Sequence, residues 1–191
     1  MSERANYFAI ATGCLDLSIR KFYPIDIYQD RHPLTEQPEI VLREYLKWAN
    51  PPAGRFYKVG IESIFAQSRL FQDVLKAGII PVKEITRRAG TGSANMNKMM
   101  RLQGLAARYR RGDIIHPGKM VGGAWLPNYA DNPWLQGFED QLADINWVDG
   151  QEQHDQDDMA DAWAVVCELL AEWILASATP AAAQYIPFSV S

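Results

Sequence analysis

The pattern of apolar and polar positions predicts a chain in which short strands and amphipathic helices alternate. Residues 7–14 and 21–30 are both rich in β-forming side chains, and the short polar connector between them is typical of a β-hairpin. Pro24 lies inside the second of these segments. Because proline has no N–H to donate to a strand ladder, we expect Pro24 at a strand edge or at a bulge.

A strand, a helix and a second strand are predicted in the middle of the chain. The apolar segment 56–61 is followed by an amphipathic segment at 64–77 and by another short apolar segment at 79–85. A helix between two neighbouring strands is the usual connection of a parallel pair, so this order predicts a parallel crossover. Before the crossover, the spacing predicts a helix over 35–49 with Thr35 as its N-cap.

The second half of the chain is predicted to be mainly helical. Its segments are a helix at 94–111, a hairpin around 116–118, a helix at 132–145, a polar loop at 148–156 and a helix from 157 or 158 to 174. After residue 176 the sequence consists mainly of Ala, Thr, Pro and Ser, which is typical of a loosely held tail. We therefore predict one α/β domain over 1–176 and a loosely ordered tail over 177–191.

Length and composition are those of an ordinary folded domain. The 191 residues are 48% hydrophobic and 22% charged, which excludes a disordered or fibrous chain. With only Cys14 and Cys167, the chain can form neither a disulfide scaffold nor a cysteine-built zinc site, and a reducing compartment is favoured. No apolar run reaches the roughly 20 residues that a membrane helix needs, and the first residues lack the features of a signal peptide. We therefore expect a cytoplasmic protein without membrane contact.

Charge is distributed unevenly along the chain. From Lys83 to Lys119 there are nine basic and two acidic residues, a net charge of +7, whereas 131–161 contains ten acidic residues and no Lys or Arg. A metal-dependent nuclease needs a surface that attracts phosphates and carboxylates that hold cations. Two solvated helix faces would give the same pattern, and on charge alone this simpler interpretation is favoured.

Four carboxylates crowd the start of the last predicted helix: Asp155, Asp157, Asp158 and Asp161. Asp161 follows Asp157 by four residues and Asp158 by three, so a helix places these side chains on neighbouring positions. The helix dipole favours one or two acids at this end, which is the purely structural explanation. Four close carboxylates repel one another unless a cation lies among them, and oxygen ligands favour Mg²⁺, Mn²⁺ or Ca²⁺ over zinc. The residues therefore favour a metal site over a simple helix cap.

Glu62 directly follows the predicted strand at 56–61. Sites in open α/β sheets form at the carboxyl ends of strands, and a carboxylate there is costly unless it is solvated, paired or bound to a cation. The alternative is that Glu62 or Ser63 caps the following helix. Together with the cluster at 157–161, Glu62 becomes a candidate for the second part of a metal site.

Basic residues on the helix at 94–111 are spaced so that they can share one face. These residues are Lys98, Arg101, Arg108 and Arg111. Arg87 and Arg88 lie beside the glycine-rich segment 90–93, and a basic loop of this kind suits phosphate contact. All six side chains are candidate DNA-binding residues, and a solvated amphipathic helix is the alternative. The segment 90–93 lacks the Lys-Ser/Thr ending of a Walker A loop, so ATP hydrolysis is not expected.

Neither the histidines nor the cysteines form a recognisable catalytic motif. His32, His116 and His154 lack the spacing of a zinc site, and an exposed or structural role is favoured for each. Neither cysteine has the sequence context of a nucleophile.

Taken in order, these segments resemble a known family. The sequences YFAIATG, IDIYQDR, VGIES, NKMMRLQGLAARYRRGDI and DDMADAWA, spread from about Tyr7 to about Leu170, are similar to the C-terminal nuclease domain of the large terminase subunit of tailed bacteriophages. The resemblance implies a ribonuclease-H-like mixed sheet flanked by helices. It also implies an endonuclease that uses Mg²⁺ or Mn²⁺ to cut double-stranded DNA during genome packaging, in the cytoplasm of a bacterial host. The partners it implies are a terminase ATPase domain or subunit, the small terminase and the portal.

The resemblance also assigns roles to the acidic residues. Glu62 and Asp158 correspond to metal ligands of the family and are the first candidates for catalytic residues. Asp161 is a candidate for an additional metal ligand, and both Asp157 and Asp161 are candidates for assisting catalysis.

Two parts of the family pattern have no counterpart in the chain. The ATPase half is missing, and so is the first strand with its catalytic Asp; the nearby Glu3, Asp16 and Asp26 do not match that motif. Without this strand the sheet has unpaired edges, and we expect self-association. The alternatives are therefore a fragment, a split-gene partner or a decayed remnant that only binds DNA or an ATPase subunit. An unrelated metal-binding or structural α/β domain is the remaining interpretation.

Overall fold

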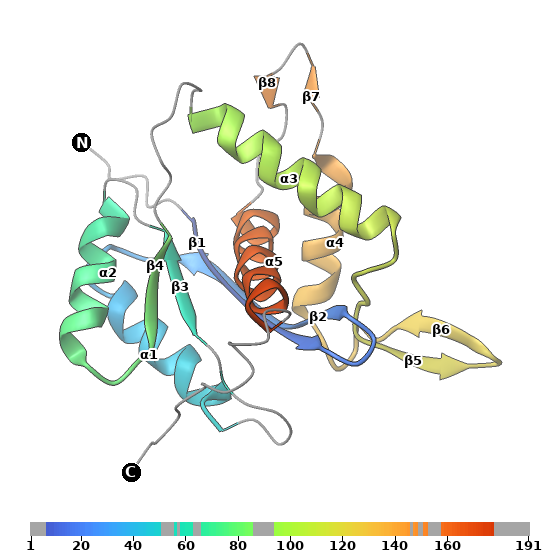
Figure 1. The fold of residues 1–191 in the computed structure, drawn as a ribbon, viewed down its shortest axis with the longest axis horizontal. Helices are drawn as coiled ribbons and strands as arrows, with labels where there is room; N and C mark the ends of the chain where they lie inside the picture. The colour runs from blue at the N-terminus through green and yellow to red at the C-terminus, as the bar shows by residue number, and fades with distance from the viewer. Residues whose placement is uncertain are drawn as a thin grey trace.

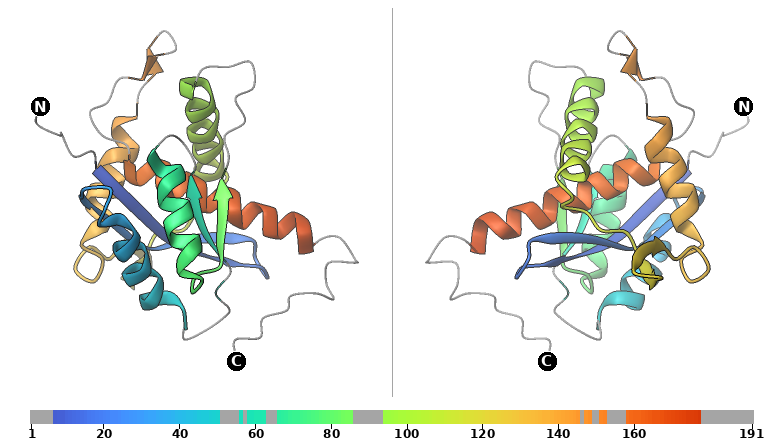
Figure 2. Two further views of the ribbon diagram at one scale, coloured as in Figure 1. Left: turned by 90° about the vertical axis from the view of Figure 1, so that its left-hand side faces the viewer. Right: turned by 90° about the vertical axis from the view of Figure 1, so that its right-hand side faces the viewer.

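The computed structural model has a mixed α/β architecture, in which a long antiparallel hairpin and a short parallel strand pair lie between helices (Figure 1 and Figure 2). The structure describes residues 7–50, 56, 58–62, 66–85, 94–145, 147–148, 151–152 and 158–177. The expected tail therefore lies outside the described residues, except for Ser177 at the end of the last helix. No helix within these ranges combines the length and the apolarity that a membrane span requires.

The expected β-hairpin is confirmed. It consists of β1 (Tyr7–Asp16) and β2 (Lys21–Arg31), which pair in antiparallel register. The register shifts between Thr12 and Gly13, and Pro24 lies opposite Gly13 at this irregularity. A bulge tolerates a residue that cannot donate an N–H, so the expectation for Pro24 is confirmed.

Alternating side chains of β1 contribute to two apolar cores on the two faces of the hairpin. Phe8 and Ile10 pack against the first core, which lies beside α1 (Gln37–Trp48) and α2 (Ala66–Ala77). Ala11 and Leu15 pack against the second core, which is built from α3 (Ala94–Arg110), α4 (Trp134–Asp144) and α5 (Asp158–Ser177). This division follows from the two-residue period of a strand.

The expected parallel crossover is also confirmed. β3 (Val59–Glu62) and β4 (Val82–Ile85) pair in parallel, and α2 connects them. Each strand is shorter than the apolar segment that predicted it. Among the described residues, the β3–β4 pair and the β1–β2 hairpin form separate two-stranded sheets.

The faces of β3 decide where its last residue points. Ile61 belongs to the core beside α1 and α2, whereas Gly60 faces α5 so closely that a Cβ would lie 2.5 Å from the Leu169 side chain. Because strand side chains alternate, Glu62 lies on the same face of β3 as Gly60. The strand therefore directs Glu62 to the side of the sheet that α5 covers.

Three local expectations are corrected by the structure. α1 begins at Gln37 with Glu36 at the N-cap position and no side-chain cap hydrogen bond, so Thr35 is not the cap; Pro38 occupies the first turn, where its missing N–H costs nothing. The polar segment after α4 contains the short strands β7 (Trp147–Val148) and β8 (Gln151–Glu152), which pair with each other.

The third correction concerns the second hairpin, whose turn was expected at 116–118. Its strands are β5 (Gly118–Val121) and β6 (Ala124–Pro127), and the turn is formed by Gly122 and Gly123 with φ of +58° and +85°. A two-residue hairpin turn with positive φ at both positions is matched to the strand twist, and glycine adopts it without strain.

Candidate functional site

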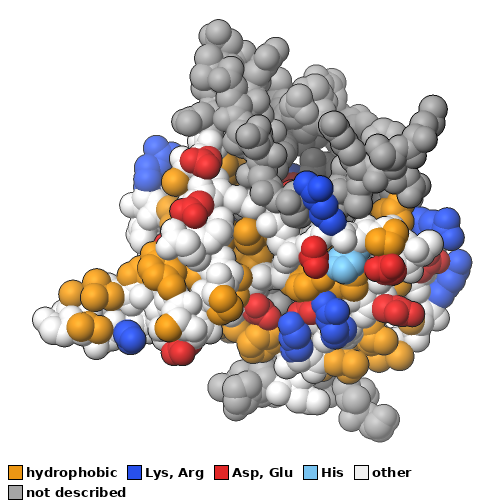
Figure 3. All heavy atoms as spheres, turned by 180° about the vertical axis from the view of Figure 1, so that it is seen from behind, with side chains coloured by type: hydrophobic (Ala, Val, Ile, Leu, Met, Phe, Trp, Pro, Cys, Tyr) orange, Lys and Arg blue, Asp and Glu red, His pale blue; other side chains and the backbone are white. Residues whose placement is uncertain are grey.

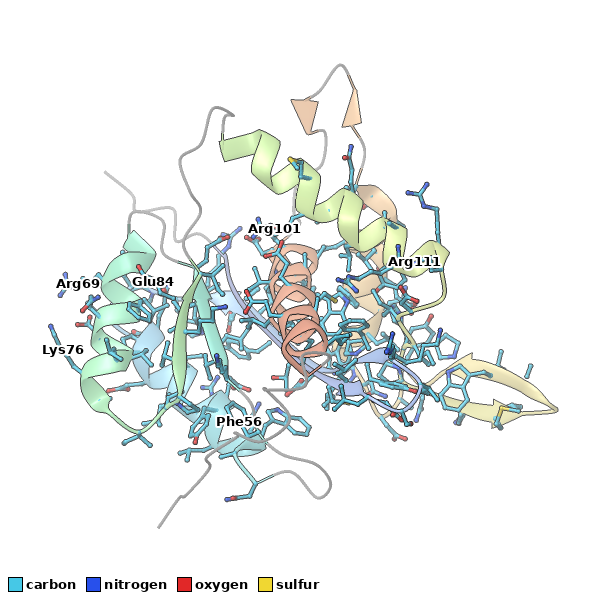
Figure 4. The ribbon with its side chains drawn as sticks, in the orientation of Figure 1. Phe56, Arg69, Lys76, Glu84, Arg101 and Arg111 are labelled. Atoms are coloured by element: carbon cyan, nitrogen blue, oxygen red, sulfur yellow. The ribbon has the colours of Figure 1, made fainter. Side chains whose placement is uncertain are left out.

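Two predicted metal ligands both contact the same arginine side chain at the junction of β3, α3 and α5. Glu62 is the last residue of β3, and Asp161 lies in the first turn of α5. Arg101 of α3 reaches both carboxylates: its Nη1 donates to Glu62 Oε1 at 2.7 Å, and its Nη2 lies 2.6 Å from Asp161 Oδ1. Figure 4 shows Arg101 between α3 and the upper end of α5. We call these three residues the Arg101 cluster.

The Arg101 cluster lies largely inside the protein. The side chains of Arg101, Glu62 and Asp161 are only 6%, 16% and 20% exposed. Buried charges are tolerated when opposite charges and hydrogen bonds compensate the loss of water, and a guanidinium can serve two carboxylates at once. The fold therefore brings together two acids that are nearly a hundred residues apart in the chain, and it supplies a cation between them.

The inward position of Arg101 follows from its place on α3. Leu105 is four residues after Arg101 and three before Arg108, so all three lie on one side of the helix. Leu105 is 3% exposed and belongs to the core beside α5. The spacing that predicted a shared face for these arginines was therefore correct, but this face is turned toward the protein rather than toward solvent.

The expected single basic surface is not formed by the described members of the set. The Arg108 guanidinium lies 4.7 Å above the centre of the Phe22 ring. Arg111 is 58% exposed and pairs with Asp113 at 2.7 Å, at the opposite end of α3 from the Arg101 cluster (Figure 4). The side chain of Lys98, and both Arg87 and Arg88, lie outside the described residues.

A second polar network holds the start of α5, and neither of its glutamines was predicted. Asp158 Oδ2 accepts from Gln29 Nε2 at 3.5 Å, and Gln29 Oε1 accepts from Gln141 Nε2 at 3.3 Å. Gln141 Oε1 in turn accepts the backbone N–H of Met159 at 3.0 Å. Gln141 is 7% exposed and follows the buried Phe138 by three residues, so a polar residue on the apolar face of the predicted helix was the signal for its role.

Replacing Gln141 with leucine is expected to lower the free energy of unfolding by about 1–2 kcal/mol, because the buried N–H of Met159 loses its acceptor. Backbone hydrogen exchange should accelerate at the first turn of α5. Gln136 is the matched control, since it is exposed and lies on the same helix. Denaturant unfolding of Gln141→Leu and Gln136→Leu measures the difference; equal effects would show that the hydrogen bond to Met159 contributes nothing.

Of the other predicted metal-site residues, Asp158 lies in the described part of the structure and Asp157 does not. Asp158 begins α5, one helical turn before Asp161. Within the described ranges, no group of three or more His, Cys, Asp or Glu side chains is arranged to hold a metal ion. The donor chemistry of Glu62 and Asp161 nevertheless suits a hard divalent cation, because both supply carboxylate oxygens to one shared positive charge.

The described histidines have internal partners, as expected for structural residues. His116 Nδ1 lies 2.6 Å from Glu139 Oε1, and its Nε2 lies 2.7 Å from the hydroxyl of Tyr109. His32 contacts the hydroxyl of Tyr28 at 2.6 Å. Burial raises the pKa of Cys167 to about 12, so this thiol is protonated at neutral pH and unsuited to nucleophilic attack.

Neither a scan against protein-family models nor a search of curated proteins finds a match for this chain. The functional argument therefore depends on the Arg101 cluster and on its position at the junction of β3, α3 and the acidic start of α5.

Proposed function

We propose that the chain is a divalent-metal-dependent endonuclease domain of the large-terminase kind, with a ribonuclease-H-like fold, that cuts double-stranded DNA in the cytoplasm of a bacterial host. Glu62, Asp158 and Asp161 are the proposed metal-binding and catalytic residues, with Asp157 in an assisting role. The proposed partners are DNA and a terminase ATPase domain or subunit, together with the small terminase and the portal.

The observation that supports this proposal most directly is the meeting of Glu62 and Asp161. A carboxylate at the carboxyl end of a parallel strand and one in the first turn of a distant helix both contact the Arg101 guanidinium, at 2.7 and 2.6 Å. Topology alone brings them together, since no local pattern links the two segments. The family resemblance assigned Asp158 at the start of the last helix to this role, whereas the acid that shares Arg101 with Glu62 is Asp161, one turn further along α5.

The residues fit a divalent cation in chemistry and in charge. Glu62 and Asp161 would hold Mg²⁺ or Mn²⁺ with oxygen atoms, and Asp158 lies one turn away on the same helix. When bound, such an ion polarises a phosphodiester and lowers the pKa of bound water. The chain itself contributes the fixed start of α5 through Gln141, and the positioning of Glu62 by the alternation of β3. Because the Arg101 guanidinium already pairs with both carboxylates, metal and guanidinium compete for them.

A metal titration followed by a cleavage assay tests the proposal. Mn²⁺ should raise the melting temperature of the chain, because it binds the folded state alone. Asp158→Asn and Glu62→Gln should each reduce the rise in melting temperature, measured relative to the same variant without metal. Each should also abolish cleavage of duplex DNA. Asp16→Asn is the control, since Asp16 is the last residue of β1 and accepts hydrogen bonds from the backbone N–H and the hydroxyl of Ser18. Cleavage that survives Asp158→Asn and Glu62→Gln would refute the assignment.

A second candidate function is DNA or ATPase-subunit binding without cleavage. The observation that favours it is the position of Arg101, which occupies the space between the two carboxylates in the described structure. In that case Mn²⁺ should leave the melting temperature unchanged, while affinity for any DNA duplex should fall steeply with salt. Binding that is flat in salt, or absent at low salt, would remove the nucleic-acid role altogether.

A further inference from the structure

The hairpin of β5 and β6, residues 118–127, projects from the body of the molecule; we call it the arm (Figure 1). Met120 and Trp125 are opposed across it and share one face, whereas Val121 and Leu126 lie on the other face. The exposed fractions of these side chains are 63%, 53%, 47% and 46%. In Figure 3 the arm extends to one side and is covered mainly by hydrophobic side chains.

An arm that is apolar on both faces is unusual for a surface element. A two-stranded hairpin is marginally stable alone in water, and contiguous exposed apolar side chains mark an interaction surface. Two hydrogen bonds tie the arm to the segment before it: Trp125 Nε1 donates to the carbonyl of His116 at 3.2 Å, and the N–H of Asn128 donates to the carbonyl of Pro117 at 3.2 Å. The apolar side chains of the arm are therefore suited to burial against a second surface.

The same chain contains a surface that matches the arm in chemistry. A cavity of about 540 Å³ lies between α3 and α4, and most of its wall is apolar: Leu105, Ala106, Leu142, Ala143 and Ile145. Its volume is within the range that accepts a ligand or several side chains. His116 and Glu139 form its polar edge.

The charge of the arm is complementary to that of α4, one of the two cavity walls, whereas α3, the other wall, contains basic residues and no acid. The arm contains Lys119, which is exposed, and no acidic residue. α4, which forms one wall of the cavity, contains Glu139, Asp140 and Asp144 and no basic residue. Complementary charges of this kind fix the register of an apolar contact and disfavour other partners.

We propose that two copies of this chain associate by exchanging arms, so that the arm of each copy lies in the cavity between α3 and α4 of the other. Val121 and Leu126, which share one face of the arm, then contact the apolar wall, and Lys119 on the same face approaches the acids of α4. His116 at the edge of the cavity is two residues before Gly118 at the start of the arm. Because arm and cavity adjoin, a single two-fold axis can relate both contacts, which gives a closed dimer rather than a filament. This inference does not depend on the nuclease proposal.

Association of the purified chain tests the proposal, with molar mass measured by light scattering over a wide concentration range. An arm variant, Val121→Ser with Leu126→Ser, and a cavity variant, Ala106→Arg with Ala143→Arg, both change exposed positions and should remain folded by circular dichroism. The wild type should be dimeric, and either variant should weaken association by about a hundredfold, as loss of central interface residues does. Leu75→Ser is the control, since Leu75 is an exposed apolar residue of α2, away from the arm.

Mixing the two variants gives the sharpest result. The arm variant retains an intact cavity and the cavity variant retains an intact arm, so the mixture should form heterodimers through one intact contact. A monomeric wild type at every concentration would overturn the proposal, and so would a cavity variant that still dimerises, because the arms would then pair with each other. A loss of DNA affinity in the arm variant without any change in association would likewise overturn it and assign the arm to nucleic acid.

Discussion

Replacing Arg101 with methionine should lower the free energy of unfolding by about 3–5 kcal/mol, the cost typical of removing one partner from a buried ion pair. The change removes the guanidinium that pairs with Glu62 and Asp161, and both of these carboxylates are at least four-fifths buried. Since a domain of this size has only about 5–15 kcal/mol of stability in total, the variant should unfold at a much lower denaturant concentration.

The matched control is Arg111→Met. Arg111 follows α3 and also pairs with a carboxylate, Asp113, but its side chain is 58% exposed, so the loss should stay below about 1 kcal/mol. Adding Glu62→Gln and Asp161→Asn to Arg101→Met should recover part of the lost stability, because the two buried side chains are then neutral and no longer repel each other. If Arg101→Met costs no more than Arg111→Met, the Arg101 cluster does not stabilise the fold.

The effect of Mn²⁺ on the melting temperature of Arg101→Met tests the role of Arg101 in the proposed metal site. Under the proposed function, Mn²⁺ replaces the missing cation, so it should raise the melting temperature of Arg101→Met more than that of the wild type. A smaller rise in Arg101→Met than in the wild type would show that Arg101 helps to hold the metal rather than competing with it.

Replacing Trp163 with alanine should lower the free energy of unfolding by a similar amount, about 3–5 kcal/mol. Trp163 is fully buried at the centre of the core between β1 and α5. Its ring lies so close to β1 that a Cβ on Gly13 would be 2.3 Å from a ring carbon. The substitution therefore opens a large cavity beneath α5, the helix that bears Asp158 and Asp161, and chemical denaturation measures its cost.

Combining Gly13→Ala with Trp163→Ala in a double-mutant cycle tests the contact between these two residues. In the wild type the added methyl group collides with Trp163, so the variant should be destabilised, whereas in the Trp163→Ala background the same change should cost little. Additive losses in the double variant would show that Gly13 and Trp163 do not contact each other as the structure places them.

The secondary structure was predictable to the extent that it depends on local pattern. Two β-rich segments around a polar connector predicted the β1–β2 hairpin, and the missing N–H of Pro24 predicted its irregularity opposite Gly13. The turn of the arm was predicted wrongly, although Gly122 and Gly123 were a stronger local signal than His116-Pro117-Gly118. Two adjacent glycines supply the positive φ angles that a tight hairpin turn requires.

The acidic residues of the candidate site were predictable from the sequence, but the arginine that pairs with them was not. Glu62 was found because a carboxylate directly after a buried strand is energetically costly unless it is solvated, paired or bound to a cation. The cluster at 157–161 was found because several carboxylates at one helix start repel one another. Arg101 was assigned to a DNA-binding surface, since helical spacing groups residues on a face without showing which way that face points. The buried Leu105, on the same side of α3, was the available indication that this face is inward.

The sequence by itself determined the order of the elements from β1 to α4 and the final helix α5, a strand edge or bulge for Pro24, the parallel crossover, and the acidic cluster at 157–161. These features follow from side-chain period, backbone chemistry and charge within a few residues of each other. Only the tertiary structure decided that Glu62 pairs with Arg101 and Arg101 with Asp161, and that Gln141 holds the start of α5. Those contacts depend on how β3, α3, α4 and α5 pack together, and the free energy of such packing comes from residues far apart in the chain.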